Sequence, residues 1–381
     1  MLTSTRGIVA EVGAVIACLT GIGARSGSQP AAPRFPPPQL EMRVPFEPTA
    51  FPGAGRTHLI YELYLRNFEA GPIAIRRVEV LDAETGAARP VAAFEGARLD
   101  DVLQDVGVRR SLNAAEKTRQ LAGGGSAILF MSMAFDGGVP VPSRLRHRVL
   151  TADAVVEGAT IGTHHTPLRV LGRPLTESGW VARSGPSNDS YHRRGFLVFD
   201  GAATIDRRYA IDWVRTKNDA TFTGDALDNR SYYAHGESVL AVADGRIVAA
   251  RGDIPENVPR HDGFRPAVPL SMNTLAGNTI TLSIGGGLVA YYMHLQPGSL
   301  RVKSGDRVRR GQVLALVGNS GDSREPHLHF ELTTSAVPFS GEGVPFLIDR
   351  FRVRSADGSW QTRIRELPLA DMEIDFGLRA R

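Results

Sequence analysis

The sequence predicts a mainly β protein with two domains of moderate size. Its 381 residues exceed the usual length of a single domain. Its 41 glycines and 24 prolines favour turns and short strands over long helices. Short segments in which apolar and polar residues alternate recur along the chain, separated by turn residues, and this pattern is typical of half-buried strands.

The first half, residues 39–175, is expected to form an antiparallel β-sandwich of the immunoglobulin-like kind. In THLIYELYLRNF (57–68), every second residue from Leu59 to Leu65 is apolar, as in a strand with one face in a core. Several short strands at regular spacing are what such a sandwich requires. The other strand-like runs lie within 73–94, 126–135 and 144–156, and a short helix-like piece lies at 99–107.

Residues 1–38 are expected to be an export leader followed by a proline-rich linker. Arg6 precedes a weakly apolar stretch that Glu11 interrupts and that is too short to cross a bilayer. Cys18, the only cysteine, lies inside this stretch. It would either leave with a cleaved leader or carry a lipid that tethers the protein to a membrane. We therefore expect an exported protein of the periplasm or cell envelope.

Charge and cysteine content exclude several kinds of site. The net charge of +4 comes from 44 basic and 40 acidic residues without a long basic run, so no nucleic-acid partner is expected. With Cys18 in the leader, the folded part has no thiol for a disulfide or a thiolate metal site. Any metal must therefore be held by His, Asp or Glu side chains.

A second β-rich domain is expected over residues 176–365. It begins within a connection rich in Gly, Pro and Ser at residues 174–190. Its strand-like segments include AIDWV, SVLAVADGRIVAA, NTITLSIGGGLVAYYMHL and HLHFELTT. Residues 366–381 are expected to form a C-terminal tail.

Four residues of this domain are candidates for chemistry. His327 and His329 are two apart in SREPHLHFEL, so both imidazoles share one face of an extended strand. His294 ends another apolar strand. Asp212 lies among apolar neighbours in AIDWV, where an unpaired carboxylate would be unfavourable, so it needs a partner. That partner is either a metal ion or one of the nearby arginines.

Several blocks of the second half, in the same order, resemble the catalytic domain of the lysostaphin/LytM-type zinc metallopeptidases, which cut peptide cross-links of bacterial cell walls. The blocks are ESVLAVADGRIVAA, YYMHL, DRVRRGQVLALVGNSG and HLHFEL, and the resemblance covers about residues 190–350. It implies a LytM-type β-barrel or antiparallel-sheet domain that binds one Zn²⁺ per chain. The implied substrate is a peptide bond of peptidoglycan cross-links or stem peptides.

The resemblance also implies roles for individual residues. His329 and Asp212 match metal ligands of the family. His294 and His327 match the histidines that act on the attacking water and on the oxyanion. Four residues before Asp212, where the family has its first histidine ligand, this chain has Arg208, and a guanidinium cannot ligate zinc.

Either the site is inactive or another histidine replaces the missing ligand. A hairpin between residues 193–199 and 206–213 would place His192 opposite Asp212, so His192 is our predicted third ligand. His235 is the second choice. The alternative function is a catalytically inactive LytM-like factor that binds the cell wall or activates another hydrolase. Keeping four site residues together favours the enzyme, because a site without metal has no physical reason to retain them.

Overall fold

The computed structural model describes residues 36–86, 89–107, 119–259 and 263–377. These residues form mostly strands with a few short helices, which confirms the mainly β prediction. The predicted leader, including Cys18, lies outside the described residues. In the part of the chain that is described, no helix is long and apolar enough to span a membrane.

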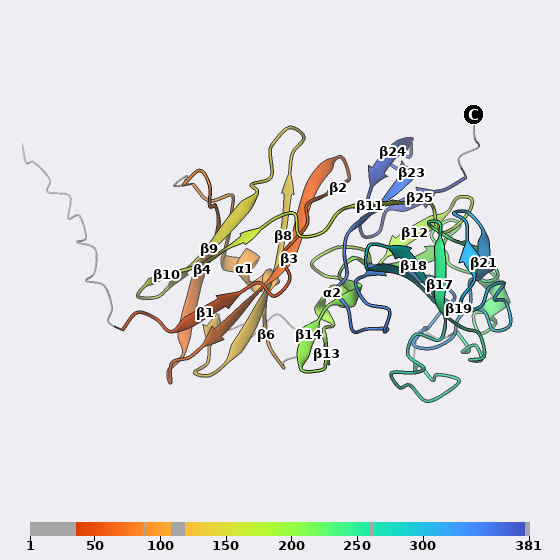
Figure 1. The fold of residues 1–381 in the computed structure, drawn as a ribbon, viewed down its shortest axis with the longest axis horizontal. Helices are drawn as coiled ribbons and strands as arrows, with labels where there is room; N and C mark the ends of the chain where they lie inside the picture. Colours follow the sequence, from red (N-terminus) through yellow and green to blue (C-terminus); the bar gives the residue numbers. More distant parts are fainter. Residues whose placement is uncertain (1–35, 87–88, 108–118, 260–262, 378–381) are drawn as a thin grey trace, which may run out of the picture.

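The N-terminal part is a sandwich of two antiparallel sheets, red to yellow in Figure 1. Its elements are β1 (Leu40–Arg43), β2 (Phe51–Gly53), β3 (Arg56–Asn67), β4 (Ile73–Asp82), β5 (Ala92–Glu95), α1 (Gly96–Val102), β6 (Leu103–Asp105), β7 (Gln120–Leu121), β8 (Ser126–Phe135), β9 (Arg144–Thr151) and β10 (Val155–Gly162). One sheet has the order β1-β3-β8-β6 with β2 on β3, and the other has β10-β9-β4-β5 with β7 on β4. Apolar side chains of both sheets, such as Leu63 and Val78, share one core. The immunoglobulin-like topology stays a prediction.

Strand β3 is buried on both faces, whereas its alternation predicted burial on one. Leu59, Tyr61 and Leu63 lie in the sandwich core, as expected. Ile60 and Glu62 point to the opposite face and are also buried, each only 2% exposed. Ile60 belongs to the core of the C-terminal half, so this face packs against that half. From the sequence alone, a charged residue such as Glu62 in an alternating strand is expected to face solvent. It is buried here because the C-terminal half packs against this face of β3.

The C-terminal half is built around an 11-stranded sheet. Its elements are β11 (Arg169–Leu171), β12 (Trp180–Arg183), α2 (Tyr191–Arg194), β13 (Leu197–Phe199), β14 (Ala202–Thr204), η2 (Asp206–Tyr209), β15 (Ile211–Arg215), η3 (Asn229–Ser231), β16 (Ser238–Leu240), β17 (Gly245–Arg251), β18 (Asn278–Gly285), β19 (Leu288–Leu295), β20 (Arg307–Val308), β21 (Val313–Leu316), β22 (Leu328–Thr333), β23 (Phe346–Arg354), β24 (Trp360–Glu366) and β25 (Glu373–Asp375). The sheet order is β11-β23-β25-β12-β15-β22-β19-β18-β17-β20, with β24 on β23.

The middle of this sheet positions the candidate site residues. Strands β15 and β22 are antiparallel, with Asp212 opposite His329. Strand β19 pairs with the other edge of β22, with Met293 opposite His329, so His294 follows directly at the end of β19. Most of the three strands is buried on both faces, which agrees with their nearly continuous apolar sequences.

The described part of the expected C-terminal tail, residues 366–377, instead contributes a strand to the large sheet. Strand β25 pairs with β12 and with β23, and Ile374 and Phe376 are buried in the core. At the other boundary, β11 pairs in parallel with β23, although residues 169–171 fall within the predicted sandwich. Both strands have only three residues, so their sequences are too short to show an alternation.

His147 of β9 is expected to make the stability of the sandwich depend on pH. Its imidazole is buried and shares a 2.8 Å hydrogen bond with the hydroxyl of Tyr61. Burial lowers the pKa of His147 from 6.5 to about 4. As the pH falls between these values, the unfolded chain binds a proton that the folded protein does not. The free energy of unfolding should therefore fall by about 3 kcal/mol over this range.

Urea unfolding at neutral pH and near pH 4 would measure this loss, with the variant His147→Gln as the control. Glutamine can still hydrogen-bond Tyr61 but does not titrate, so its contribution to the pH dependence should disappear. An identical pH dependence in both proteins would contradict the prediction.

Candidate metal centre and active site

Side chains from three separate elements converge on one point. His192 lies on α2, Asp212 on β15 and His329 on β22, and each offers a ligand atom within 4.8 Å of the other two. All three are buried. Among the described residues this is the one group of His, Cys, Asp or Glu side chains found in such an arrangement.

Asp212 lies at the centre of the cluster. Its Oδ1 accepts a 2.8 Å hydrogen bond from Nδ1 of His329 and lies 3.5 Å from Nε2 of His327. Its Oδ2 accepts a 2.7 Å hydrogen bond from the hydroxyl of Tyr191 and lies 3.3 Å from Nε2 of His192. Burial acts to raise the pKa of Asp212, but the adjacent histidines hold that pKa well below its ordinary value. Asp212 is therefore a carboxylate, the form that binds cations.

His192 presents a free nitrogen lone pair toward Asp212. Its Nδ1 lies 3.1 Å from the backbone carbonyl oxygen of Ser184. A carbonyl oxygen only accepts hydrogen bonds, so Nδ1 carries the proton and Nε2 does not. Burial lowers the pKa of His192, which favours this neutral form. Neutral imidazole is the form that ligates metal ions.

His329 is oriented by a carboxylate on each side. Its Nε2 lies 3.3 Å from Oε2 of Glu331, opposite the Nδ1 that faces Asp212. Burial acts to lower the pKa of His329, but the hydrogen bonds to the two carboxylates outweigh it and raise that pKa to about 9. Without a metal, His329 therefore carries a proton on each nitrogen near neutral pH. A metal ion would displace the proton on Nδ1, while Glu331 would retain the proton on Nε2, the arrangement typical of metal-bound histidines.

Glu331 and Tyr191 are site residues that sequence reasoning missed. Glu331 follows His329 by two positions in β22, so the alternation that puts His327 and His329 on one face also includes it. Tyr191 directly precedes His192 and contacts it, with 4.3 Å between the ring centroids. Nothing in the sequence around Tyr191 distinguishes it from a surface tyrosine.

His294 and His327 form a second pair beside the cluster, with ring centroids 4.8 Å apart. Nδ1 of His294 donates to the carbonyl of Ser320 at 2.8 Å, and Nδ1 of His327 donates to the carbonyl of Glu325 at 2.8 Å. Burial and the neighbouring histidines lower the pKa of His294 well below its ordinary value. The pKa of His327 is raised, because Asp212 outweighs the effect of burial. The neutral form is therefore favoured for His294, and the protonated form for His327.

The predicted hairpin around His192 was wrong, although His192 does lie beside Asp212. Strands β13 and β14 pair Leu197 with Thr204, so the hairpin ends before Asp212 and has a different register. Asp212 pairs with Arg183 on β12 and with His329 on β22 instead. The helix α2 brings His192 to the cluster. A short helix was not expected there because no periodicity can show in four residues.

Arg208, which occupies the family's ligand position, and His235, the second choice for the missing ligand, are both engaged with glutamates. The Arg208 guanidinium is buried against Glu62 and Glu342, with one 2.8 Å contact to each. His235 pairs with Glu256 at 3.1 Å and is not part of the cluster.

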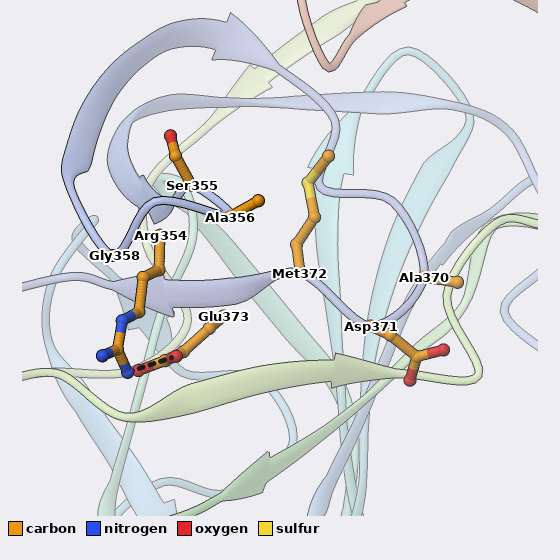
Figure 2. A pocket seen from close by; sticks show the side chains of 8 residues that line it. All are labelled: Arg354, Ser355, Ala356, Gly358, Ala370, Asp371, Met372 and Glu373. Carbon is orange, nitrogen blue, oxygen red and sulfur yellow. Dashed lines mark hydrogen bonds and ion pairs between the residues drawn. The ribbon is translucent and has the colours of Figure 1, made fainter.

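A surface pocket shown in Figure 2 is separate from this site. It is lined by Arg354, Ser355, Ala356, Gly358, Ala370, Asp371, Met372 and Glu373. Two of these residues, Arg354 and Glu373, form an ion pair of 3.1 Å. Since no lining residue is a histidine or belongs to the cluster, this pocket offers none of the chemistry described above.

The donor set of the cluster fits zinc. Catalytic zinc sites combine imidazole nitrogens and carboxylate oxygens from three protein ligands and leave a position for water. Here the atoms that would bind the metal are Nε2 of His192, a carboxylate oxygen of Asp212 and Nδ1 of His329. All three residues are buried, and these atoms lie close together. Each of the two histidines has a hydrogen-bond acceptor on its other nitrogen, which fixes the ring orientation.

Part of this chain is similar to two curated endopeptidases. Peptidoglycan DD-endopeptidase ShyA of Vibrio cholerae serotype O1 (strain ATCC 39315 / El Tor Inaba N16961) is 40% identical over 63 residues, which are 16% of this chain and 14% of that protein. Glycyl-glycine endopeptidase ALE-1 of Staphylococcus capitis is 35% identical over 102 residues, 26% of this chain and 22% of that protein. The chain thus spans less than a quarter of either relative.

Among solved structures, the catalytic domain of the antimicrobial peptidase lysostaphin from Staphylococcus simulans is 21% identical, with a TM-score of 0.23 over 46% of this chain and 88% of that chain. Residues 230–340 match the family described as Peptidase family M23. The matched segment includes His294, His327 and His329. It begins after His192 and Asp212, which therefore lie outside it. The match to peptidase family M23 is thus confined to residues 230–340, within the C-terminal half.

Proposed function

We propose that the protein is a zinc-dependent metalloendopeptidase that hydrolyses peptide bonds in peptidoglycan cross-links or stem peptides. The convergence of His192, Asp212 and His329 on one point carries the proposal, because it restores a three-ligand site although Arg208 occupies the usual ligand position. The names of the two curated relatives support an endopeptidase, and the name of the first supports peptidoglycan as the substrate class. Peptidoglycan as substrate implies export to the periplasm or cell envelope. The exported protein would then be either free or tethered to a membrane by a lipid on Cys18.

The residues around the cluster would divide the catalytic work. A zinc ion held by the three ligands would supply Lewis-acid activation of water near neutral pH. His294 is neutral with a bare Nε2, so it would accept the proton of the attacking water. The Nδ1 of His327 is fixed on a carbonyl and its pKa is raised, so its Nε2 would donate a hydrogen bond to the oxyanion.

The second candidate function is an inactive factor that binds the wall or activates another hydrolase. The observation behind it is Arg208, which replaces a ligand of the family and is engaged in ion pairs. This candidate predicts a protein that binds sacculi without releasing soluble fragments and without retaining zinc.

Digestion of purified sacculi tests the proposal directly. We expect the purified protein to release soluble muropeptides, with product masses that identify the cleaved bond. A zinc chelator should stop the release, and added Zn²⁺ should restore it, because the proposed reaction needs the metal at the cluster. Release that is insensitive to the chelator, or no release from any wall type, would contradict the proposal.

A further inference from the structure

The helix that carries His192 has little support of its own. Helix α2 has four residues, Tyr191–Arg194, and lies outside all the sheets. So short a helix is not stable by itself in water. Yet His192 and Arg193 are both buried, with Arg193 0% exposed. The position of His192 must therefore be set by what surrounds α2.

Arg193 is held mainly by the N-terminal sandwich. Its Nε donates to Oε1 of Glu62 on β3 at 2.9 Å. Its Nη2 donates to the backbone carbonyls of Tyr61 at 2.8 Å and Met131 at 2.7 Å. These three acceptors lie on the paired strands β3 and β8. The residue directly after His192 is thus anchored in the other domain.

Arg194 adds a second anchor to the same domain. Its Nη2 donates to the carbonyl of Asp101 at 2.6 Å, and its guanidinium lies 4.5 Å from the ring centroid of Phe130 on β8. Figure 1 shows α2 between the sandwich and the large sheet, which agrees with these contacts.

Glu62 also holds the segment that leads to Asp212. Its Oε2 accepts a 2.8 Å hydrogen bond from Nε of Arg208, four residues before Asp212. One buried carboxylate of the sandwich therefore connects the two segments that carry His192 and Asp212. The arginine that occupies the lost ligand position takes part in the same connection.

We propose that the sandwich is a structural part of the metal site, because Glu62 fixes Arg193 and Arg208 and thereby holds His192 within reach of Asp212. Glu62 and Arg193 are positioning residues, since neither contacts the metal position. The inference rests on the proposed function. It implies that zinc affinity depends on the docking of the N-terminal domain, although all three ligands lie in the C-terminal half.

Zinc affinity of the full chain tests this inference. A chromogenic chelator in competition would give the dissociation constant of Zn²⁺ for wild type and for Glu62→Gln. We expect binding about 10- to 100-fold weaker in the variant, the usual effect of removing a group that orients a metal ligand. The matched control is Glu366→Gln, which neutralises a carboxylate that accepts a 3.2 Å hydrogen bond from the backbone N–H of Gly55 in the sandwich, away from α2. This control should bind zinc like the wild type.

Glu62→Gln leaves two buried arginines with less compensation, so it can also impair folding. The double variant Glu62→Gln/Arg193→Gln restores the charge balance, and a glutamine side chain in place of Arg193 is too short to reach the carbonyls of Tyr61 and Met131. Circular dichroism and thermal unfolding without metal would show that it folds, and its zinc affinity should still be reduced. If wild type binds zinc and the folded variants bind it equally well, the inference is overturned while the proposed function stands. If wild type binds no zinc, both are overturned.

Discussion

Replacing His329 by alanine is expected to remove zinc from the purified protein and to reduce the release of muropeptides to the level seen with a chelator. His329 provides one of three donors in a buried cluster, and two remaining ligands do not make a stable catalytic zinc site. The variant also leaves Asp212 and Glu331 without the imidazole between them, so Asp212, a second proposed ligand, loses a partner that orients it. Metal analysis by mass spectrometry and digestion of sacculi would measure both effects.

His192→Ala should have the same effect as His329→Ala, whereas His235→Ala should retain zinc and activity. His192 and His235 were the two candidates for the missing ligand, and only His192 lies in the cluster. His235→Ala is therefore a control of the same chemistry outside the site. Equal zinc contents in wild type and His329→Ala would favour the inactive wall-binding factor.

Replacing His294 by alanine is expected to preserve zinc but to lower kcat by about 10²- to 10⁴-fold, the usual contribution of a general base. His294 is not in the ligand cluster, so metal content should not change. Its hydrogen bond to Ser320 leaves Nε2 unprotonated, and its lowered pKa keeps it neutral at the pH of the reaction. Turnover of a soluble peptide fragment of peptidoglycan, with zinc measured on the same sample, would separate the two effects.

His327→Ala provides the comparison for the general base. Loss of an oxyanion donor lowers kcat by about 10²- to 10³-fold but removes no base, so it should leave the pH profile of kcat largely in place. His294→Ala should instead change the acidic limb of that profile. Loss of zinc from His294→Ala, or an unchanged kcat, would contradict the assigned role.

Part of this protein follows from its sequence alone. The alternation in residues 57–68 specifies a strand with its Leu and Tyr side chains in a core, and β3 has that face in the sandwich. His329 lies in β22 and His327 directly precedes that strand, and both imidazoles approach Oδ1 of Asp212, as their spacing of two in extended backbone predicts. Asp212 needed a partner because it lies in an apolar strand, and it is surrounded by imidazoles. These are local consequences of backbone geometry and burial.

The tertiary structure alone decided how His192 reaches the cluster and what holds it there. Sequence spacing suggested a hairpin, but α2 carries His192, and Glu62 helps to fix α2 through Arg193, which lies 131 positions later in the chain. In the sequence, Arg208 only marks the position where the family's histidine ligand is missing. In the fold, Arg208 forms an ion pair with Glu62, the same carboxylate that holds Arg193. Buried charges are stable only when paired, and the identity of their partners depends on which surfaces dock. The partners of these buried charges are therefore set by how the two domains pack together, and no periodicity or residue spacing in the sequence indicates them.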